Sequence, residues 1–324
     1  MHIAHITEFF YPAVAGIESA VYETAKRLVE RGHRVTVYTS KSVFTMFNNL
    51  PAYEEIDGIR IKRFSHRINY VGTWFPQIEQ DEDILHFSNY NINPHTFLIK
   101  KYYNVKPVIL TFHGGFSRFE GDYPLAADLD LIAKWCWQYT FGKRYLRKID
   151  KLIALNGWER NNLIKKGALP DRIDIVPNGI DEDAFKQYSP VVLDKPYILS
   201  LSRISSIKDL DHGIMVLSRL KDVYYVIAGK ESETGLLNQL KKLAAVTGVI
   251  DRVIFTGEIK GEDKYRYLAG AEVVIVPSRW EMQSLTILES MAQGKIIVAS
   301  NEFGNPYTIE DKTTGILYEY GDLD

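Results

Sequence analysis

Short apolar runs rich in β-branched residues recur along the chain, and stretches with apolar residues every three to four positions separate many of them. The runs are typical of buried strands and the spacing between them is typical of amphipathic helices. Because strands joined by helices pair in parallel, the pattern predicts βαβ units. In the first half the expected strands are 2–7, 34–40, 59–64, 83–87, 107–112 and 151–156, with a helix over about 18–31.

The pattern is interrupted once and then restarts. Pro177 ends a strand that begins near 173, and Asn178-Gly179 is a strong turn signal, after which 181–196 is polar. Beyond it we expect helices from about 209 and over 232–247, and strands 197–202, 223–229, 252–257, 272–278 and 295–300. The chain is therefore predicted to be an α/β protein with two Rossmann-like doubly wound parallel-sheet domains facing a cleft, 1–188 and 189–324.

Composition narrows the class of protein. With 324 residues, 46% hydrophobic and 25% charged, the chain is long enough for two globular domains. A net charge of −2 gives no basic field for nucleic acid. The single cysteine, Cys136, is interpreted as a small buried apolar residue; it excludes an intrachain disulfide and fits a reducing, cytoplasmic compartment. No signal peptide and no apolar run of roughly 18 residues is visible, so we expect a soluble protein.

Ligands of parallel sheets bind beyond the carboxyl ends of the strands, so the residues that follow each strand are the first candidates for a binding site. Gly16 follows the first strand at a helix start, where backbone amides favour an anion. His113 follows the strand at 107–112, in the sequence His-Gly-Gly. An ordinary loop glycine and a structural histidine are the alternatives. The first loop lacks the Gly-x-Gly-x-x-Gly pattern, so a nicotinamide site is not supported.

Two cations follow the first strand of the second half. Arg203 and Lys208 are five positions apart, with two serines between them and a helix after them. A guanidinium and an ammonium in a strand-to-helix loop suit a phosphate. Two solvated loop cations are the alternative interpretation.

Two glutamates surround the start of a later helix. Glu281 lies in the loop after strand 272–278, and Glu289 lies inside a helix that begins near Ser284. Glu289 is one residue from the core row marked by Leu288, so we expect it to be partly covered and to have polar partners, because an unpaired buried charge is costly. Vicinal sugar hydroxyls would supply two donors to such a carboxylate. The alternative is two glutamates on a helix surface.

These residues resemble those of the group 1 retaining glycosyltransferases with the GT-B fold, over nearly the whole chain. The most specific element is Glu-x7-Glu, formed by Glu281 and Glu289, and it is supported by Arg-x4-Lys at Arg203 and Lys208. Further support comes from RGHRVTVYTS at 31–40, NGID at 178–181 and FTG at 255–257.

The resemblance implies a nucleotide-diphosphate sugar as the donor substrate, an N-terminal acceptor domain and a C-terminal donor domain, with no cofactor and no metal. It further implies retention of the anomeric configuration and transfer of a hexosyl unit to a saccharide or lipid-linked acceptor. By this resemblance, Glu281 and His113 contact the donor sugar, and Glu289 contacts the ribose. The diphosphate is bound by Arg203, Lys208, Gly16 and the helix start at Ser284 and Leu285. The base is contacted by Glu258 and Ile259.

Three positions depart from the family pattern. Ala15 replaces the first of two glycines, Gln283 and Ser284 replace an aromatic residue and a glycine, and Tyr307 stands at an acidic place. These departures concern the identity of the sugar more than the fold. The chain ends at 324, where relatives usually continue with helices that cross back to the first domain, and we interpret this as a shortened second domain.

Other functions fit part of the pattern. The alternatives are a GT-B nucleotide-sugar epimerase or phosphorylase and a non-catalytic sugar-nucleotide-binding subunit. A separate hypothesis is peripheral membrane contact through 139–150 at the inner membrane face, where four basic residues share one face of an expected helix and apolar residues at i, i+4 spacing lie beside them. A solvated surface helix is the alternative there. The basic residues are Lys143, Arg144, Arg147 and Lys148, beside Phe141, Tyr145 and Ile149.

Overall fold

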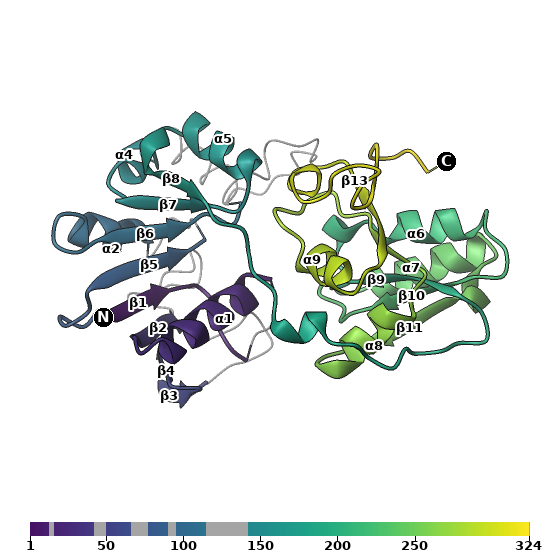
Figure 1. Ribbon diagram of the computed structural model, residues 1–324, viewed down its shortest axis with the longest axis horizontal. Coiled ribbons are helices and arrows are strands. Elements are labelled where there is room, and N and C mark those ends of the chain that lie inside the picture. Colours follow the sequence, from purple (N-terminus) through teal and green to yellow (C-terminus); the bar gives the residue numbers. More distant parts are fainter. Residues whose placement is uncertain (13–15, 42–49, 66–76, 90–94, 115–141, 324) are drawn as a thin grey trace. The chain divides into compact units, whose positions relative to one another are not determined.

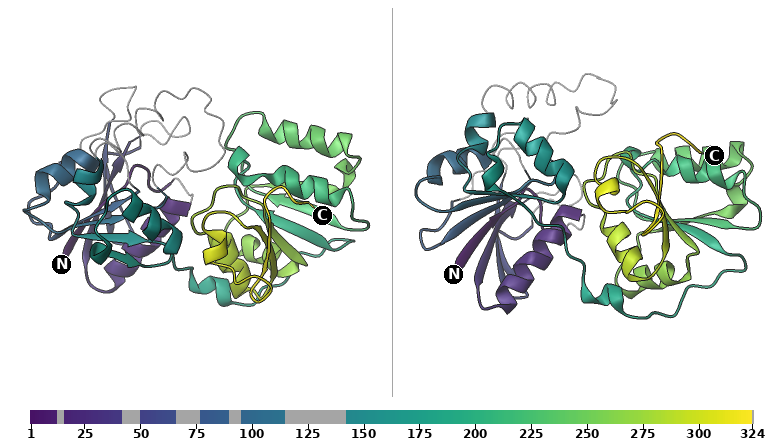
Figure 2. Two further views of the ribbon diagram at one scale, coloured as in Figure 1. Left: turned by 90° about the horizontal axis from the view of Figure 1, so that it is seen from above. Right: turned by 45° about the horizontal axis from the view of Figure 1, so that its top comes forward.

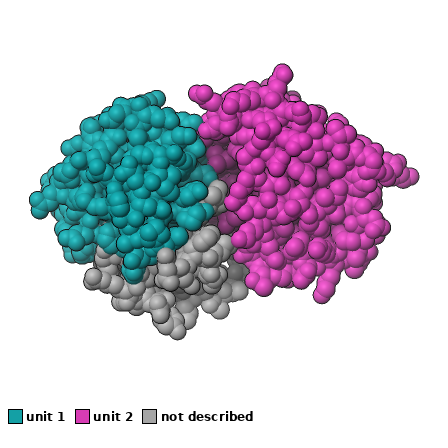
Figure 3. Space-filling view, turned by 90° about the horizontal axis from the view of Figure 1, so that it is seen from below, with its two compact units in different colours: residues 1–178 teal, residues 179–324 magenta. Residues whose placement is uncertain are grey.

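A computed structural model describes residues 1–12, 16–41, 50–65, 77–89, 95–114 and 142–323. Cys136, Ala15 and residues 139–141 lie outside these ranges, so the predictions made for them are not addressed by the structure. The chain divides into two compact units, residues 1–178 (unit 1) and 179–324 (unit 2), which Figure 3 distinguishes by colour.

Unit 1 is built on a sheet of the order β3-β4-β2-β1-β5-β6-β7-β8 (Figure 1). Its neighbouring strands pair in parallel, apart from β3 and β4. The strands are β1 (His2–Ile6), β2 (Arg34–Ser40), β3 (Tyr53–Ile56), β4 (Ile59–Phe64), β5 (Ile84–Ser88), β6 (Val108–Thr111), β7 (Lys151–Ala154) and β8 (Ile173–Ile175). The helices are α1 (Gly16–Glu30), α2 (His95–Tyr102), α4 (Lys143–Leu146) and α5 (Gly157–Lys165).

The hairpin of β3 and β4 was not predicted. Asp57 and Gly58 connect the two strands with φ of 50° and 74°, and Ile56 pairs with Ile59. An Asp-Gly pair with both residues in the left-handed region is the favoured two-residue hairpin turn. The dipeptide was therefore a readable signal for this edge strand.

Unit 2 has the sheet order β11-β10-β9-β12-β13-β14, with all neighbours parallel. This is the order of a doubly wound nucleotide-binding sheet, in which β9 and β12 flank the point where the chain reverses direction across the sheet. The elements are β9 (Tyr197–Leu201), α6 (Leu210–Leu217), β10 (Tyr224–Ala228), α7 (Leu236–Val246), β11 (Val253–Gly257), α8 (Glu262–Gly270), β12 (Val273–Val276), α9 (Leu285–Ala292), β13 (Ile296–Ser300) and β14 (Ile316–Tyr318).

Alternation along the strands explains why helices cover both faces of the unit 2 sheet. Leu199 of β9 belongs to an apolar layer with α8 and α9, whereas its neighbour Ile198 belongs to a layer with α6 and α7. Figure 2 shows the sheet between these helices. In unit 1, α1 packs on one face through Val21 and Ala25, and α2 packs on the other through Leu98. The predicted α/β class with two parallel sheets is confirmed.

The segment after the Asn-Gly turn packs on unit 2. Residues 182–185 form a short 3-10 helix in which Ala184 is fully buried in the unit 2 core. The side chain of Gln293, the residue after α9, donates hydrogen bonds to the carbonyls of Ala184 (2.5 Å) and Lys186 (2.9 Å). Residues 179–188, which the sequence analysis placed in the first domain, therefore belong structurally to the second.

Candidate functional site

The carboxyl ends of β9 and β12 bring two of the predicted residues together. The two strands are parallel neighbours, so the loops that follow them share one edge of the sheet. Lys208 ends a short 3-10 helix after β9, Glu281 lies in the loop after β12, and the two form an ion pair. Their side chains are 14% and 16% exposed, so a ligand can still reach both.

A second ion pair, which the sequence analysis missed, lies directly beside the first. Asp209 follows Lys208, and Arg279 precedes Glu281 by two positions. The Arg279 guanidinium donates to both oxygens of Asp209, with Nη2–Oδ1 at 2.6 Å and Nε–Oδ2 at 3.3 Å. Two ion pairs, Lys208–Glu281 and Arg279–Asp209, thus join the loop after β9 to the loop after β12.

Arg203 stands apart from these pairs. It follows β9 in the same loop as Lys208, but its side chain is exposed. Its guanidinium makes no hydrogen bond or ion pair with a residue in the described ranges, although its backbone carbonyl accepts a hydrogen bond from Ser202 Oγ at 3.3 Å. The structure therefore places only one of the two predicted cations, Lys208, against a carboxylate.

A third loop supports the backbone at Glu281. Gly304 donates its backbone N–H to the Glu281 carbonyl at 2.8 Å. A Cβ added at Gly304 would lie 1.7 Å from the Met282 carbonyl oxygen, so only glycine allows this approach. The Phe303 and Trp280 rings lie with centroids 4.3 Å apart. Tyr307, at the altered acidic place, is half exposed to solvent.

Helix α9 begins where the sequence predicts. Ser284 is the residue before its first turn, and its Oγ accepts a hydrogen bond from the N–H of Ile287 at 3.4 Å. Leu285 is the first helical residue, so the amides of this turn and the positive end of the helix dipole lie beside Glu281 in the chain. Free amides and the positive end of a helix dipole are the features that bind anions at helix starts.

Glu289 is covered and paired, as expected from its position beside the core row. Its carboxylate accepts a hydrogen bond from Lys264 Nζ of α8 at 2.7 Å. The side chains of Glu289 and Lys264 are 12% and 25% exposed. Lys264 itself was missed, because the contact joins two helices that the sequence does not show to be neighbours.

The residues proposed for the base lie after β11. Glu258 is exposed and pairs with Lys260 at 3.1 Å. The Ile259 side chain packs against the unit 2 core. The Ile259 side chain is only partly exposed, whereas the Glu258 side chain is open to solvent.

In unit 1, His113 lies in a tight turn after β6. His113 and Gly114 have φ of 49° and 82°. The buried Glu159 carboxylate holds this turn, because it accepts the N–H of Gly114 at 2.5 Å and that of Leu155 at 2.7 Å. Burial raises the pKa of Glu159 to about 7, against the opposing effect of these two hydrogen bonds.

His113 is neutral near pH 7. Burial lowers its pKa to about 4, and the nearby His86 acts in the same direction. His86 and His5 lie on adjacent strands with ring centroids 4.4 Å apart. A neutral imidazole can donate or accept a hydrogen bond, which is the chemistry needed to contact a sugar hydroxyl.

Gly16 is exposed at the first position of α1. A Cβ there would meet no described residue within 4 Å. The packing of the described part of unit 1 therefore gives no reason for a glycine at this position.

The proposed membrane segment differs from its prediction. Of residues 142–150, only Lys143–Leu146 is α-helical. Ile149 is fully buried in the unit 1 core and Tyr145 is half-buried against it, so Ile149 is not available to lipid. Lys143, Arg144 and Arg147 are exposed, whereas Lys148 lies 4.1 Å above the Tyr103 ring. Within the described residues, no helix combines the length and apolar character that a membrane span requires.

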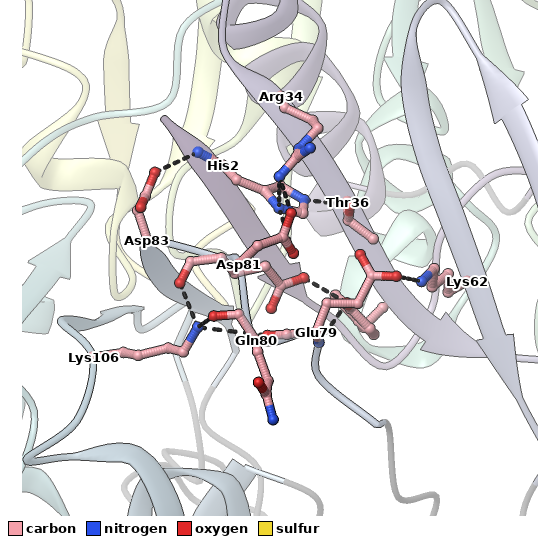
Figure 4. A network of polar contacts seen from close by, with 11 residues as sticks. His2, Arg34, Thr36, Lys62, Glu79, Gln80, Asp81, Asp83 and Lys106 are labelled. Atoms are coloured by element: carbon pink, nitrogen blue, oxygen red, sulfur yellow. Dashed lines mark hydrogen bonds and ion pairs between the residues drawn. The ribbon is translucent and has the colours of Figure 1, made fainter.

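A separate polar network lies at the amino end of β1 (Figure 4). One ligand atom each of His2, Glu79 and Glu82 lies within 4.8 Å of the others, so these three could surround a metal ion. Their neighbours already neutralise much of the charge: Arg34 donates to His2 Nδ1 at 2.8 Å, and Lys62 pairs with Glu79. The network is at the amino edge of the sheet, whereas His113 follows the carboxyl end of β6.

Comparison with known proteins identifies the family. Residues 14–184 match the model of Glycosyltransferase Family 4, and residues 181–324 match that of Glycosyl transferases group 1. The chain belongs to the group 1 glycosyltransferases, and its two parallel-sheet units have the GT-B fold.

Individual relatives are distant in sequence. The chain is 28% identical to alpha-monoglucosyldiacylglycerol synthase of Streptococcus pneumoniae, over all of this chain and 76% of that protein. It is 31% identical to D-inositol 3-phosphate glycosyltransferase of Mycobacterium sp. (strain KMS), over 54% of this chain and 42% of that protein.

The solved structures that it resembles share the fold. Sucrose-phosphate synthase of Thermosynechococcus elongatus aligns with a TM-score of 0.80 at 18% identity, over 99% of this chain and 86% of that one. Anabaena HepE in complex with UDP and glucose aligns with a TM-score of 0.75 at 18% identity, over 100% of this chain and 87% of that one.

Proposed function

We propose that the chain is a retaining, metal-independent glycosyltransferase that moves a hexosyl unit from a nucleotide-diphosphate sugar to a saccharide or lipid-linked acceptor. The observation that carries this proposal is the arrangement in unit 2. There Lys208, Glu281 and the start of α9 share one edge of the sheet, and Glu289 lies one turn further along α9.

The proposed donor contacts follow from charge and position. Lys208 and the first amides of α9 would bind the diphosphate, while Glu281 would accept hydrogen bonds from the sugar. In the structure Lys208 and Glu281 neutralise each other. Donor binding would give Lys208 a phosphate partner and release the Glu281 carboxylate for the sugar hydroxyls.

The chemistry requires stabilisation of the leaving group. As the bond between the anomeric carbon and the phosphate oxygen breaks, negative charge grows on the nucleoside diphosphate. Lys208, the exposed Arg203 and the helix start would stabilise this charge without a metal ion. His113 and Gly16 of unit 1 are retained as proposed donor contacts, and Glu258 and Ile259 as proposed contacts of the base. A cytoplasmic location is retained in the same way.

UDP-glucose is the first donor to test, because HepE is described in complex with UDP and glucose and the pneumococcal relative is named for a glucosyl product. The assay measures UDP release with a panel of saccharide and diacylglycerol acceptors, with and without EDTA, and assigns the product anomer by NMR. Transfer with retention and unchanged rate in EDTA is expected. An inverted product or loss of activity in EDTA would refute the corresponding part of the proposal.

Membership of the family favours transfer over the epimerase and phosphorylase alternatives. The binding-subunit alternative predicts a different result: nucleotide sugar binds, but no nucleoside diphosphate is released with any donor and acceptor. Calorimetry and the release assay on the same sample distinguish the two.

A membrane contact is a second proposal, supported by the exposed Lys143, Arg144 and Arg147. Since Ile149 is buried, the contact would be electrostatic. We expect co-sedimentation with phosphatidylglycerol vesicles to fall when the three residues are changed to glutamate, and not to fall when Lys241 and Lys242 of unit 2 are changed in the same way. Equal binding of both variants would exclude this surface.

A further inference from the structure

Asp209 occupies a conformation that residues with a Cβ avoid. It has φ of 42° and ψ of 46°, immediately before α6. Glycine is the usual residue in this left-handed region, although aspartate and asparagine also occur there. Asp209 is also only 5% exposed, so its charge is removed from water. A buried carboxylate at a position where glycine would suffice needs a reason beyond the turn itself.

The reason is visible in its partners. Arg279 makes three hydrogen bonds to the Asp209 carboxylate: two from the guanidinium, and one from the backbone N–H of Arg279 at 3.0 Å. The same N–H also lies 3.0 Å from the Ile207 carbonyl. Asp209 therefore fixes both the backbone and the side chain of Arg279.

Arg279 is in turn held from a third direction. Its Nε donates to the Tyr320 hydroxyl at 2.8 Å, and its guanidinium lies 5.4 Å from the centroid of that ring. Tyr320 follows β14, an edge strand that β12 and β13 separate from β9. The Asp209–Arg279 pair is thus part of a hydrogen-bonded connection between the loops that follow β9, β12 and β14.

We propose that Asp209 and Arg279 are positioning residues, which hold the loop bearing Lys208 and the loop bearing Glu281 at a fixed separation while the donor binds. This inference rests on the proposed function. The Lys208–Glu281 pair cannot do this itself, because both of its side chains are proposed to turn to the donor. Asp209 is buried, and both oxygens of its carboxylate are already bonded to Arg279, so we expect it to stay in place during that exchange.

The sharpest test is Asp209→Gly. Glycine fits the left-handed conformation, so the turn is kept while the carboxylate is removed. The matched control is Asp222→Gly in the same unit, because Asp222 also has a positive φ, 53°, and also pairs with a cation, Lys195 at 3.3 Å, but is 86% exposed. Both variants place glycine at a residue with positive φ, but only Asp209→Gly removes a contact between the loops after β9 and β12.

With wild-type enzyme shown to transfer glucose, Asp209→Gly is expected to lower kcat/KM for the donor by about tenfold to a hundredfold, because small displacements of binding groups have effects of this size. Asp222→Gly is expected to stay within about twofold. Arg279→Lys, which keeps the charge but not the two-point contact, should fall between wild type and Asp209→Gly. Wild-type kcat/KM in Asp209→Gly would overturn the proposal.

A readout without donor separates this inference from the proposed function. Hydrogen exchange of the segments 204–210 and 277–285 is expected to be faster in Asp209→Gly than in wild type, and unchanged in Asp222→Gly. If wild type neither binds nor transfers any donor, the proposed function fails, and this exchange experiment still decides whether Asp209 and Arg279 hold the two loops in place. Unchanged exchange in Asp209→Gly would refute this positioning role.

Discussion

Glu289→Ala offers a test of the ribose contact in which two effects can be separated. The change removes the proposed acceptor for the ribose hydroxyls, and it also leaves Lys264 without its carboxylate partner. Loss of a hydrogen bond to a charged group costs about 1.5–3 kcal/mol, which corresponds to roughly ten- to 150-fold weaker binding of UDP. The protein itself should lose less stability, about 1 kcal/mol, because the 25% exposed Lys264 can recover water.

Calorimetry with UDP and with its dideoxyribose analogue measures the contact. Wild type should bind UDP more tightly than the analogue, and Glu289→Ala should bind both alike. Lys264→Ala breaks the same ion pair but keeps the carboxylate, so it should still distinguish the two ligands. If Glu289→Ala prefers UDP by the wild-type factor, or if Lys264→Ala loses the preference as fully, the ribose assignment is wrong.

Three further predictions concern Glu82, Gly304 and Lys208. Burial raises the pKa of Glu82 to about 7, although a hydrogen bond from Tyr38 opposes the rise. The folded state therefore binds this proton more tightly than the unfolded state does. The resulting stabilisation of the folded state is present below about pH 4.5 and is lost as the pH rises through about 7. Glu82→Gln should flatten that fall in urea denaturation, and a slope equal to wild type would count against the raised pKa. Gly304→Ala should lower Tm by several degrees, because the new Cβ would meet the Met282 carbonyl, and an unchanged Tm would show that the loop adapts. Lys208→Ala should lower kcat by about a hundredfold or more if it stabilises the leaving phosphate, whereas a change in KM alone would assign it to ground-state binding.

The sequence predicted those features that depend on local pattern. Strands and helices follow from apolar periodicity, and the start of α9 at Ser284 follows from the change of period after Pro277. The covering of Glu289 also followed from its place beside Leu288. The β3 hairpin was missed although Asp57-Gly58 signalled it, and the helix expected over 232–247 begins only at Leu236, after the left-handed Gly235.

Other features depend on contacts that no local pattern encodes. Asp209 and Arg279 are 70 positions apart and meet only because β9 and β12 are neighbours in the sheet. Lys264 reaches Glu289 for a similar reason, since α8 and α9 cover the same face. Ile149 was expected beside surface cations, but helical spacing over a short segment does not reveal which residues the core recruits.

The central claim is that the edge of unit 2 at β9 and β12 binds a nucleoside diphosphate. A crystal structure with UDP tests it directly. The account predicts the phosphates against Lys208 and the first turn of α9, the ribose at Glu289, and the Asp209–Arg279 pair unchanged. UDP bound at another surface, or a bound diphosphate with Lys208 still paired to Glu281, would contradict it.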